Sequence, residues 1–215
     1  VAMAKTLPGG NFVVENVAGA GGTIGASKVA RANPDGHTLL LFHIGMAATP
    51  ALYRKLSYKP LEDFEFLGMV NDVPMTVIAK PSLPAKNYKE FVAWLSANKG
   101  KINLGNAGIG SASHLCGLMW QSRLQATEAM TTIPFGGTAP AMNALLSGEV
   151  SMSFVTSLSA IPQAKNPKLR ALAVAGQQRL PQLPEVPTAA QAGGPADFDV
   201  NVLRANAGGT VQSPP

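Results

Sequence analysis

Charged side chains are scarce in this sequence. They make up 13% of the 215 residues, and 17 Lys and Arg against 12 Asp and Glu leave a net charge of +5. The basic residues are scattered singly, and no stripe of Lys or Arg alternates with aromatic residues, as is typical of nucleic-acid-binding surfaces. The sequence therefore argues against a nucleic-acid partner. Its mild positive charge suits a small anionic ligand, or serves solubility alone.

Cysteine is almost absent. Cys116 is the only one in the chain, so an internal disulfide is impossible and no CxxC pair is present. The histidines, His37, His43 and His114, lack the i, i+4 spacing of a zinc-binding helix. We therefore expect no metal and no cofactor.

Long apolar runs are also missing. No stretch reaches the roughly 18 consecutive apolar residues of a membrane-spanning helix. Val1 does not open a basic-then-apolar leader. We expect a soluble chain whose signal peptide is absent from the present sequence.

Glycine and proline are abundant, with 22 and 17 residues, and 46% of the chain is hydrophobic. This composition favours short strands and helices joined by tight connections around a sizeable core, which indicates an α/β protein. Strands are predicted at residues 11–15, 38–42, 64–70, 75–80, 102–106, 131–134, 150–155 and 169–174. Helices are predicted at residues 23–32, 50–56 and 157–165, and after N-caps at Asn87, Ser113 and Thr138.

The helix after Ser113 should bury Leu115, Leu118 and Met119, which share one face. Because strands that alternate with helices form parallel sheets, ligands are expected in the loops that follow the strands. Residues 38–42 in particular are predicted to form a parallel strand.

Three of these loops could hold an anion. The N-terminus of a helix carries unpaired N–H groups and about half a positive charge, so a glycine-rich turn before it can bind a carboxylate or phosphate. The turns at residues 18–22, 107–111 and 135–138 have this form. The second contains Gly108, Gly110 and Ser111, with Ser113 close behind. A tight loop with a serine cap would equally explain these residues.

Motifs of common enzymes are missing. Residues 19–25 depart from the dinucleotide pattern GxGxxG because Ile24 occupies the last glycine position, and no Gly-Lys pair continues into the Ser or Thr of a P-loop. No Gly-x-Ser-x-Gly elbow is present, and the adjacency of Ser113 and His114 in sequence does not place one on the other. We predict that the protein is not an enzyme, with an α/β hydrolase-like activity as the least favoured alternative.

Several motifs together resemble the signature blocks of the tripartite tricarboxylate transporter substrate-binding proteins, the Bug or TctC family. The blocks are VENVAGAGGTIG at residues 14–25, NPDGHTL at 33–39, LYRKLSY at 52–58, NAGIGSASHL at 106–115, LRALAV at 169–174 and LPEVPT at 183–188. They occur in the order that the family shows.

The resemblance implies an exported, periplasmic binding protein with the type II periplasmic binding fold, in which two α/β lobes enclose a ligand cleft. Lobe 1 would comprise residues 1–74 and 175–215, and lobe 2 residues 75–174. The fold looks truncated at both ends, because the family's first strand should precede Val1 and its last helices should follow Val200.

The implied function is capture of a small mono-, di- or tricarboxylate by a monomer that delivers it to the membrane subunits of a tripartite transporter. A sensor that carries the same ligand to a signalling receptor is the alternative. By motif, the ligand site would consist of His43, Ile44, Gly45, Ala107, Gly108, Gly110, Ser111, Ser113, His114, Phe135, Gly136 and Thr156.

Two departures from the family bear on the ligand. Phe135-Gly136 stands where the family usually has Tyr-Lys, which removes a hydroxyl and a cation. Val155 stands where an Asp is common, and that Asp often addresses a ligand amine. The sequence therefore predicts a more apolar or purely anionic ligand.

Overall fold

The computed structural model describes residues 5, 9–85, 87–126 and 129–209, without the side chains of 201–209. Residues 1–4, 6–8 and 210–215 of the expected lobe 1, and 86, 127 and 128 of lobe 2, lie outside the described residues. Within the described part, seven strands form one sheet in the order β1-β7-β2-β5-β3-β4, with β6 paired to β2. The strands are β1 Leu39–Phe42, β2 Phe64–Ala79, β3 Ile102–Asn106, β4 Met130–Pro134, β5 Met152–Thr156, β6 Arg170–Ala175 and β7 Asn201–Gly209.

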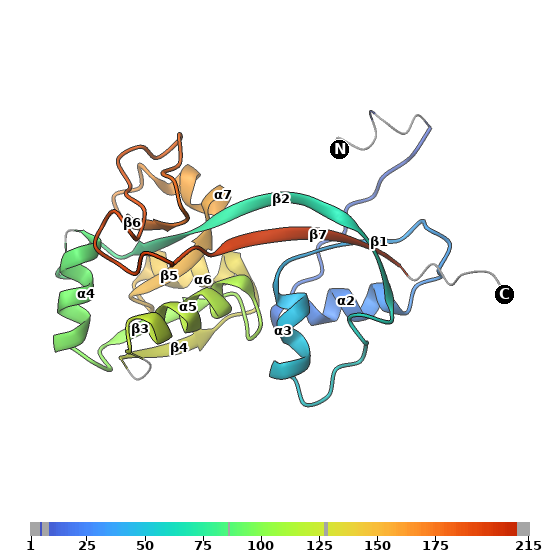
Figure 1. Cartoon of the computed structure of the whole chain (residues 1–215), viewed down its shortest axis with the longest axis horizontal. Coiled ribbons are helices and arrows are strands. Elements are labelled where there is room, and N and C mark those ends of the chain that lie inside the picture. Colours follow the sequence, from blue (N-terminus) through green and yellow to red (C-terminus); the bar gives the residue numbers. More distant parts are fainter. Residues whose placement is uncertain (1–4, 6–8, 86, 127–128, 210–215) are drawn as a thin grey trace.

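Helices cover this sheet at both ends of the molecule (Figure 1). They are α2 Thr23–Ala30, α3 Gly45–Leu52, α4 Tyr88–Ala97, α5 Ala112–Arg123, α6 Thr138–Ser147 and α7 Ser157–Ala160, with short 3-10 turns η1 Ala20–Gly22 and η2 Ile161–Gln163. In the described part of the chain, no helix combines the length and the apolar character needed to cross a bilayer.

Two long strands, β2 and β7, run side by side and join two halves of the molecule (Figure 1). Residues 64–74 of β2 pair with β7, whereas residues 75–79 pair with β5 and β6. We call β1, α2, α3 and the β7-paired part of β2 the first half. The second half contains the rest of β2, β3 to β6 and α4 to α7. The α/β fold class is confirmed.

Each half has its own core. In the second half, Trp120 stacks on Phe91 with ring centroids 5.5 Å apart and meets Phe154 edge-on at 5.5 Å. Such aromatic pairs stabilise a core beyond the area that they bury. Phe198 and Val200 belong to this same core, so the segment from 176 to 200 packs with the second half. The smaller core of the first half contains Ala26, Val29, Leu40, Phe42, Met46, Tyr58 and Phe64.

Three strand predictions differ from the structure. Two separate strands were expected at residues 64–70 and 75–80, but both belong to one continuous strand, because pairing with β7 extends to Pro74 and pairing with β5 and β6 begins at Met75. Residues 38–42 were expected to be parallel, but β1 pairs antiparallel with β7, which returns from the second half. Residues 11–15 are not a strand. Val13 and Val14 are exposed there, and no described strand lies beside them to pair with.

Helix ends were predicted with mixed success. Asn87 caps α4 as expected, since its side chain accepts a hydrogen bond from Glu90 N at 2.9 Å. Ser111, not Ser113, caps α5, because the Ser113 hydroxyl is held by Ala107 N. Gly137 precedes α6, and the Thr138 side chain makes no capping bond.

The helix predicted at residues 50–56 begins earlier, at Gly45, and contains Pro50. A proline inside a helix leaves the carbonyl four residues before it without a backbone donor. Here the Thr49 hydroxyl donates to that carbonyl, Met46 O, at 2.9 Å. The side chain of Thr49 therefore replaces the missing bond and lets the helix continue.

Candidate functional site

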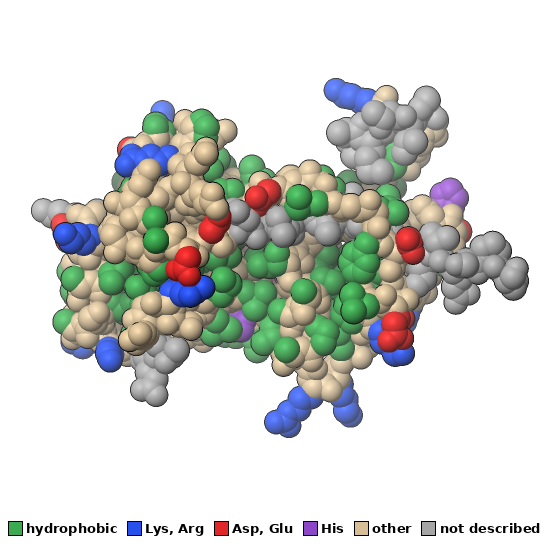
Figure 2. Space-filling model, in the orientation of Figure 1, with side chains coloured by type: hydrophobic (Ala, Val, Ile, Leu, Met, Phe, Trp, Pro, Cys, Tyr) green, Lys and Arg blue, Asp and Glu red, His purple; other side chains and the backbone are tan. Residues whose placement is uncertain are grey.

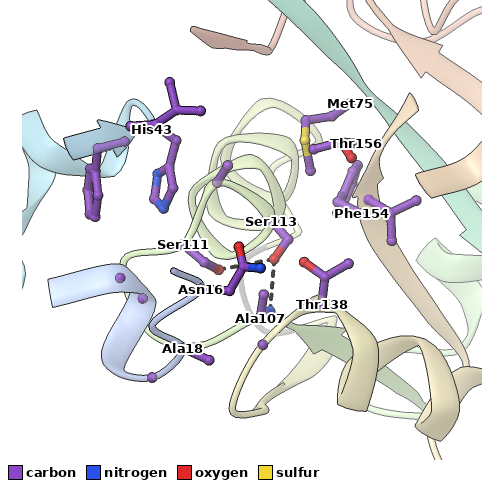
Figure 3. Close-up of a pocket in the computed structure, with 18 residues that line it drawn as sticks. Asn16, Ala18, His43, Met75, Ala107, Ser111, Ser113, Thr138, Phe154 and Thr156 are labelled. Carbon is purple, nitrogen blue, oxygen red and sulfur yellow. Dashed lines mark hydrogen bonds between the residues drawn. The ribbon is translucent and has the colours of Figure 1, made fainter. Parts of the chain in front are cut away.

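A cavity of about 370 Å³ lies between the two halves. That volume is in the range of small-molecule sites. Figure 3 shows polar side chains at the start of α5 on one side and Met75, Phe154 and Thr156 on another. The lining residues are Asn16, Ala18, Gly19, Gly21, Gly22, Leu41, Phe42, His43, Met75, Ala107, Ser111, Ala112, Ser113, Gly137, Thr138, Phe154, Val155 and Thr156.

The N-terminus of α5 forms one wall of this cavity and is held by side-chain hydrogen bonds. Ser111 Oγ accepts a hydrogen bond from His114 N at 3.2 Å and lies 3.0 Å from Ser113 Oγ. Ser113 Oγ in turn accepts from Ala107 N at 2.9 Å. The amides of Ala112 and Ser113 stand in the first helical turn, where no intrahelical acceptor exists. Hydroxyls and amides thus gather where an anion would be stabilised.

Two further helices present their N-termini to the same cavity. Gly22 precedes α2 and Gly137 precedes α6, and neither helix has a side-chain cap. Each N-terminus carries about half a positive charge. The partial positive charges of α2, α5 and α6 therefore add in the cavity. They favour a negatively charged ligand although no Lys or Arg is among the described lining residues.

The described part of the cavity wall has an uncharged lining. Among the described residues that line it, none is Asp, Glu, Lys or Arg. Figure 2 shows hydrophobic side chains exposed on both halves of one face of the molecule. The remaining wall is largely apolar, with Leu41, Phe42, Met75, Phe154 and Val155.

His43 is a polar residue in the part of the wall that the first half of the molecule forms. Its ring stacks on Phe42 with centroids 4.5 Å apart, and its Nδ1 accepts a hydrogen bond from Gly45 N at 2.9 Å. Because Nδ1 is an acceptor, the neutral ring carries its proton on Nε2. His43 is thereby oriented as a hydrogen-bond donor.

Five of the predicted site residues line the cavity: His43, Ala107, Ser111, Ser113 and Thr156. The other predicted residues are not among its described lining residues. Three of them are glycines whose amides donate hydrogen bonds to side chains of their own loops: Gly45 to His43 Nδ1, Gly108 to Asn106 Oδ1 and Gly110 to His114 Nδ1. Ile44 packs against the large core, Phe135 packs against the core beside α6, and Gly136 lies on the surface.

Several lining residues were missing from the predicted set. Gly19, Gly21 and Gly22 belong to a turn that the sequence did mark as a helix N-terminus, so a signal for them existed. Met75 and Phe154 carried no local signal, because they reach the cavity through the pairing of β2 with β5. Asn16 lies in the irregular segment before η1 and carried no local signal either.

His114 braces the loop rather than lining the cavity. Its Nδ1 accepts a hydrogen bond from Gly110 N at 3.2 Å, and burial lowers the pKa of the imidazole below its ordinary value of 6.5. A neutral ring is therefore what the folded state requires.

This lowered pKa predicts a loss of stability in mild acid. Above about pH 6.5 both the folded and the unfolded chain keep His114 neutral, and as pH falls below that value the unfolded chain takes up the proton first. The free energy of unfolding of the parent should therefore drop between about pH 7 and pH 5, and that of H114Q should drop less. Chemical denaturation at both pH values measures this.

H37Q, which changes an exposed histidine, should behave like the parent. An equal drop in H114Q and the parent would contradict the assignment.

Metal-binding clusters are not found in the described part of the chain, where no group of three or more His, Cys, Asp or Glu residues could hold an ion. Cys116 is fully buried, and burial raises the pKa of its thiol well above the ordinary value. A buried thiol in its protonated form is a poor nucleophile.

Comparison with known proteins gives consistent matches. A family model described as the tripartite tricarboxylate transporter family receptor matches residues 1–202. A protein from the TAR-I ttuE-ttuC' intergenic region of Agrobacterium vitis is 40% identical over 203 residues, which cover 94% of this chain and 58% of that protein. The chain thus spans less than two thirds of this relative's length.

Solved structures agree in fold. The periplasmic binding protein BugD is 43% identical with a TM-score of 0.86, over 94% of this chain and 66% of BugD. MatC from Rhodopseudomonas palustris, solved with bound malate, is 36% identical with a TM-score of 0.86, over 96% of this chain and 69% of MatC. The matched proteins are receptors and binding proteins, so the expected periplasmic binding fold and the expectation of a non-enzymatic family are confirmed.

Proposed function

Because the chain belongs to the tripartite tricarboxylate transporter receptor family, known as TctC or Bug, we propose that it captures a small carboxylate that lacks an amine. Members of this family are periplasmic solute-binding proteins. The observation that carries the proposal is the convergence of three helix N-termini and two serine hydroxyls on a cavity whose described lining residues are all uncharged.

A carboxylate fits this wall for an electrostatic reason. Amide and hydroxyl donors to an ionised acceptor make hydrogen bonds about twice as strong as those between neutral groups. At the start of α5, the Ser111 and Ser113 hydroxyls lie 3.0 Å apart, close enough for both to reach the two oxygens of one carboxylate. The malate bound in MatC is a ligand of this chemical class.

An amine fits the same cavity poorly. A buried ammonium group is costly unless an acidic side chain or several acceptors pair with it. No Asp or Glu is among the described lining residues, and buried Val155 occupies the wall beside Thr156. The ligand beyond its carboxylate should therefore be apolar or hydroxyl-bearing, or carry a second carboxylate.

We further propose that the two halves act as lobes that close on the ligand. The expected division at residue 175 assigned residues 176–200 to lobe 1, whereas Phe198 and Val200 pack in the core of the second half. The proposed crossings are therefore near Pro74 in β2 and near Val200, where Met75 N donates to Val200 O at 3.0 Å. Delivery to the membrane subunits of a tripartite transporter follows from the family and is part of the same proposal.

Malate and aspartate give a matched test, because they differ only in a hydroxyl against an ammonium group. Malate should raise the melting temperature and bind with a dissociation constant at least about 10-fold below that of aspartate, a difference of about 1.4 kcal/mol. Thermal-shift titration followed by calorimetry measures both. Tighter binding of aspartate than of malate would contradict the amine-free ligand class.

A further inference from the structure

Two loops from opposite halves touch beside the cavity. A Cβ atom added to Gly21 would lie 2.1 Å from Ile109 O, and one added to Gly45 would lie 2.4 Å from Gly110 O. Only residues without a side chain allow backbones to approach this closely. The turn before α2 and the start of α3 are therefore pressed directly against the loop that precedes α5.

Tyr53 spans this contact with its hydroxyl. The residue follows α3 in the first half, and its amide donates to Thr49 O at 3.0 Å, which fixes the backbone at the helix end. Its Oη lies 2.6 Å from Ile109 O in the second half and 2.8 Å from Ala20 O in the first. The ring also rests beside Gly110, where an added Cβ would come within 3.4 Å of Tyr53 Cε2.

The hydroxyl has one hydrogen to share between these two carbonyl oxygens. Ala20 O already accepts from Thr23 Oγ1 at 2.9 Å, within the same half. If the halves separate, the hydroxyl of Tyr53 keeps Ala20 O as its partner and is not left unsatisfied. Opening therefore breaks the bond to Ile109 O without leaving the Tyr53 hydroxyl unpaired, so the bond stabilises the closed arrangement by about one hydrogen bond.

The hydroxyl also keeps its proton. Burial raises the pKa of Tyr53 above its ordinary value of 10.0, so the group is a hydrogen-bond donor at neutral pH.

We propose that Tyr53 is a latch residue that holds the two halves together and thereby prolongs the lifetime of the bound ligand. The latch rests on the proposed function for the identity of the ligand, but the closure that it controls is a property of the chain alone. Tyr53 acts on the contact between the halves and does not touch the ligand, because it is not among the described residues that line the cavity.

Y53F tests the latch, and Y58F is its matched control. Tyr58 is a neighbouring tyrosine whose hydroxyl donates to Thr49 Oγ1, at 3.4 Å and within the first half. Spin labels at Lys55→Cys and Lys99→Cys, both exposed and in opposite halves, report the separation of the halves by pulsed electron paramagnetic resonance. Cys116 is buried and stays unlabelled.

Without added ligand, Y53F should show a broader distribution with longer distances than the parent, and Y58F should match the parent. With malate as the probe, the dissociation rate of Y53F should rise about 3- to 10-fold, as expected for one lost hydrogen bond. Superimposable distance distributions for Y53F and the parent, or equal broadening in Y58F, would overturn the latch. Failure of malate to bind the parent would count against the proposed function, while the distances would still decide on the latch.

Discussion

Replacing Gly21 with alanine should weaken malate binding by about 30- to 100-fold, or about 2–3 kcal/mol. The added Cβ would lie 2.1 Å from Ile109 O and 2.9 Å from Ser111 N, and both are backbone atoms that cannot move independently of their loop. The loops must therefore separate, which holds the two halves apart and opens the carboxylate site. Calorimetric titration of the parent and of G21A with malate measures the effect.

Gly36 provides the control for this change. Like Gly21 it has a positive φ, +77° against +62°, but nothing lies within 4 Å of an added Cβ. G36A should therefore incur a similar backbone strain, of the order of 1–2 kcal/mol in stability, with malate affinity unchanged within about 2-fold. If G21A bound malate as tightly as G36A, direct contact between the two loops would not be required for binding.

The double substitution S111A/S113A should weaken malate binding by about 5- to 150-fold, or about 1–3 kcal/mol. Ser111 and Ser113 line the cavity, and their loss would remove both hydroxyl donors while leaving the helix amides in place. Stability should fall as well, because Ala107 N and His114 N lose their acceptors. Affinity must therefore be measured at a temperature where the variant is folded.

Ser153 separates the two effects. It is buried, and its hydroxyl donates to Gly105 O at 2.8 Å, but it does not line the cavity. S153A should lower the melting temperature as S111A/S113A does, and its affinity for malate should equal that of the parent. Unchanged affinity in S111A/S113A would remove the two hydroxyls from the carboxylate site.

Local features were predictable from the sequence because neighbouring residues decide them. Asn87 and Glu90 are three positions apart, and the cap they form needs no distant partner. Gly148 likewise ends α6 in the left-handed conformation that glycine favours, which is a property of the residue itself.

Features that depend on distant contacts were not predictable. The serines at 111 and 113 are equivalent as caps in sequence, and the bond from Ala107 N to Ser113 decides between them. The buried face of α5 contains Cys116 and Trp120 rather than Leu118 and Met119, which are exposed, because the aromatic core fixes the rotation of the helix.

The cavity shows the same division between local and distant signals. The glycine turn at residues 18–22 and the serines of α5 were recognisable as places for an anion. Their position on opposite sides of one cavity was not recognisable, because it depends on β2 and β7, which connect the two halves. The pairing of β2 with β5 likewise brings Met75 and Phe154 to the same wall.

A crystal structure of the chain grown with malate tests the central claim most directly. The account predicts one carboxylate within hydrogen-bonding distance of the Ser111 and Ser113 hydroxyls at the N-terminus of α5, facing the turn before α2. The rest of the ligand should lie toward Met75, Phe154 and Val155. Malate bound away from the N-terminus of α5, or no bound malate at saturating concentration, would contradict carboxylate capture at this site.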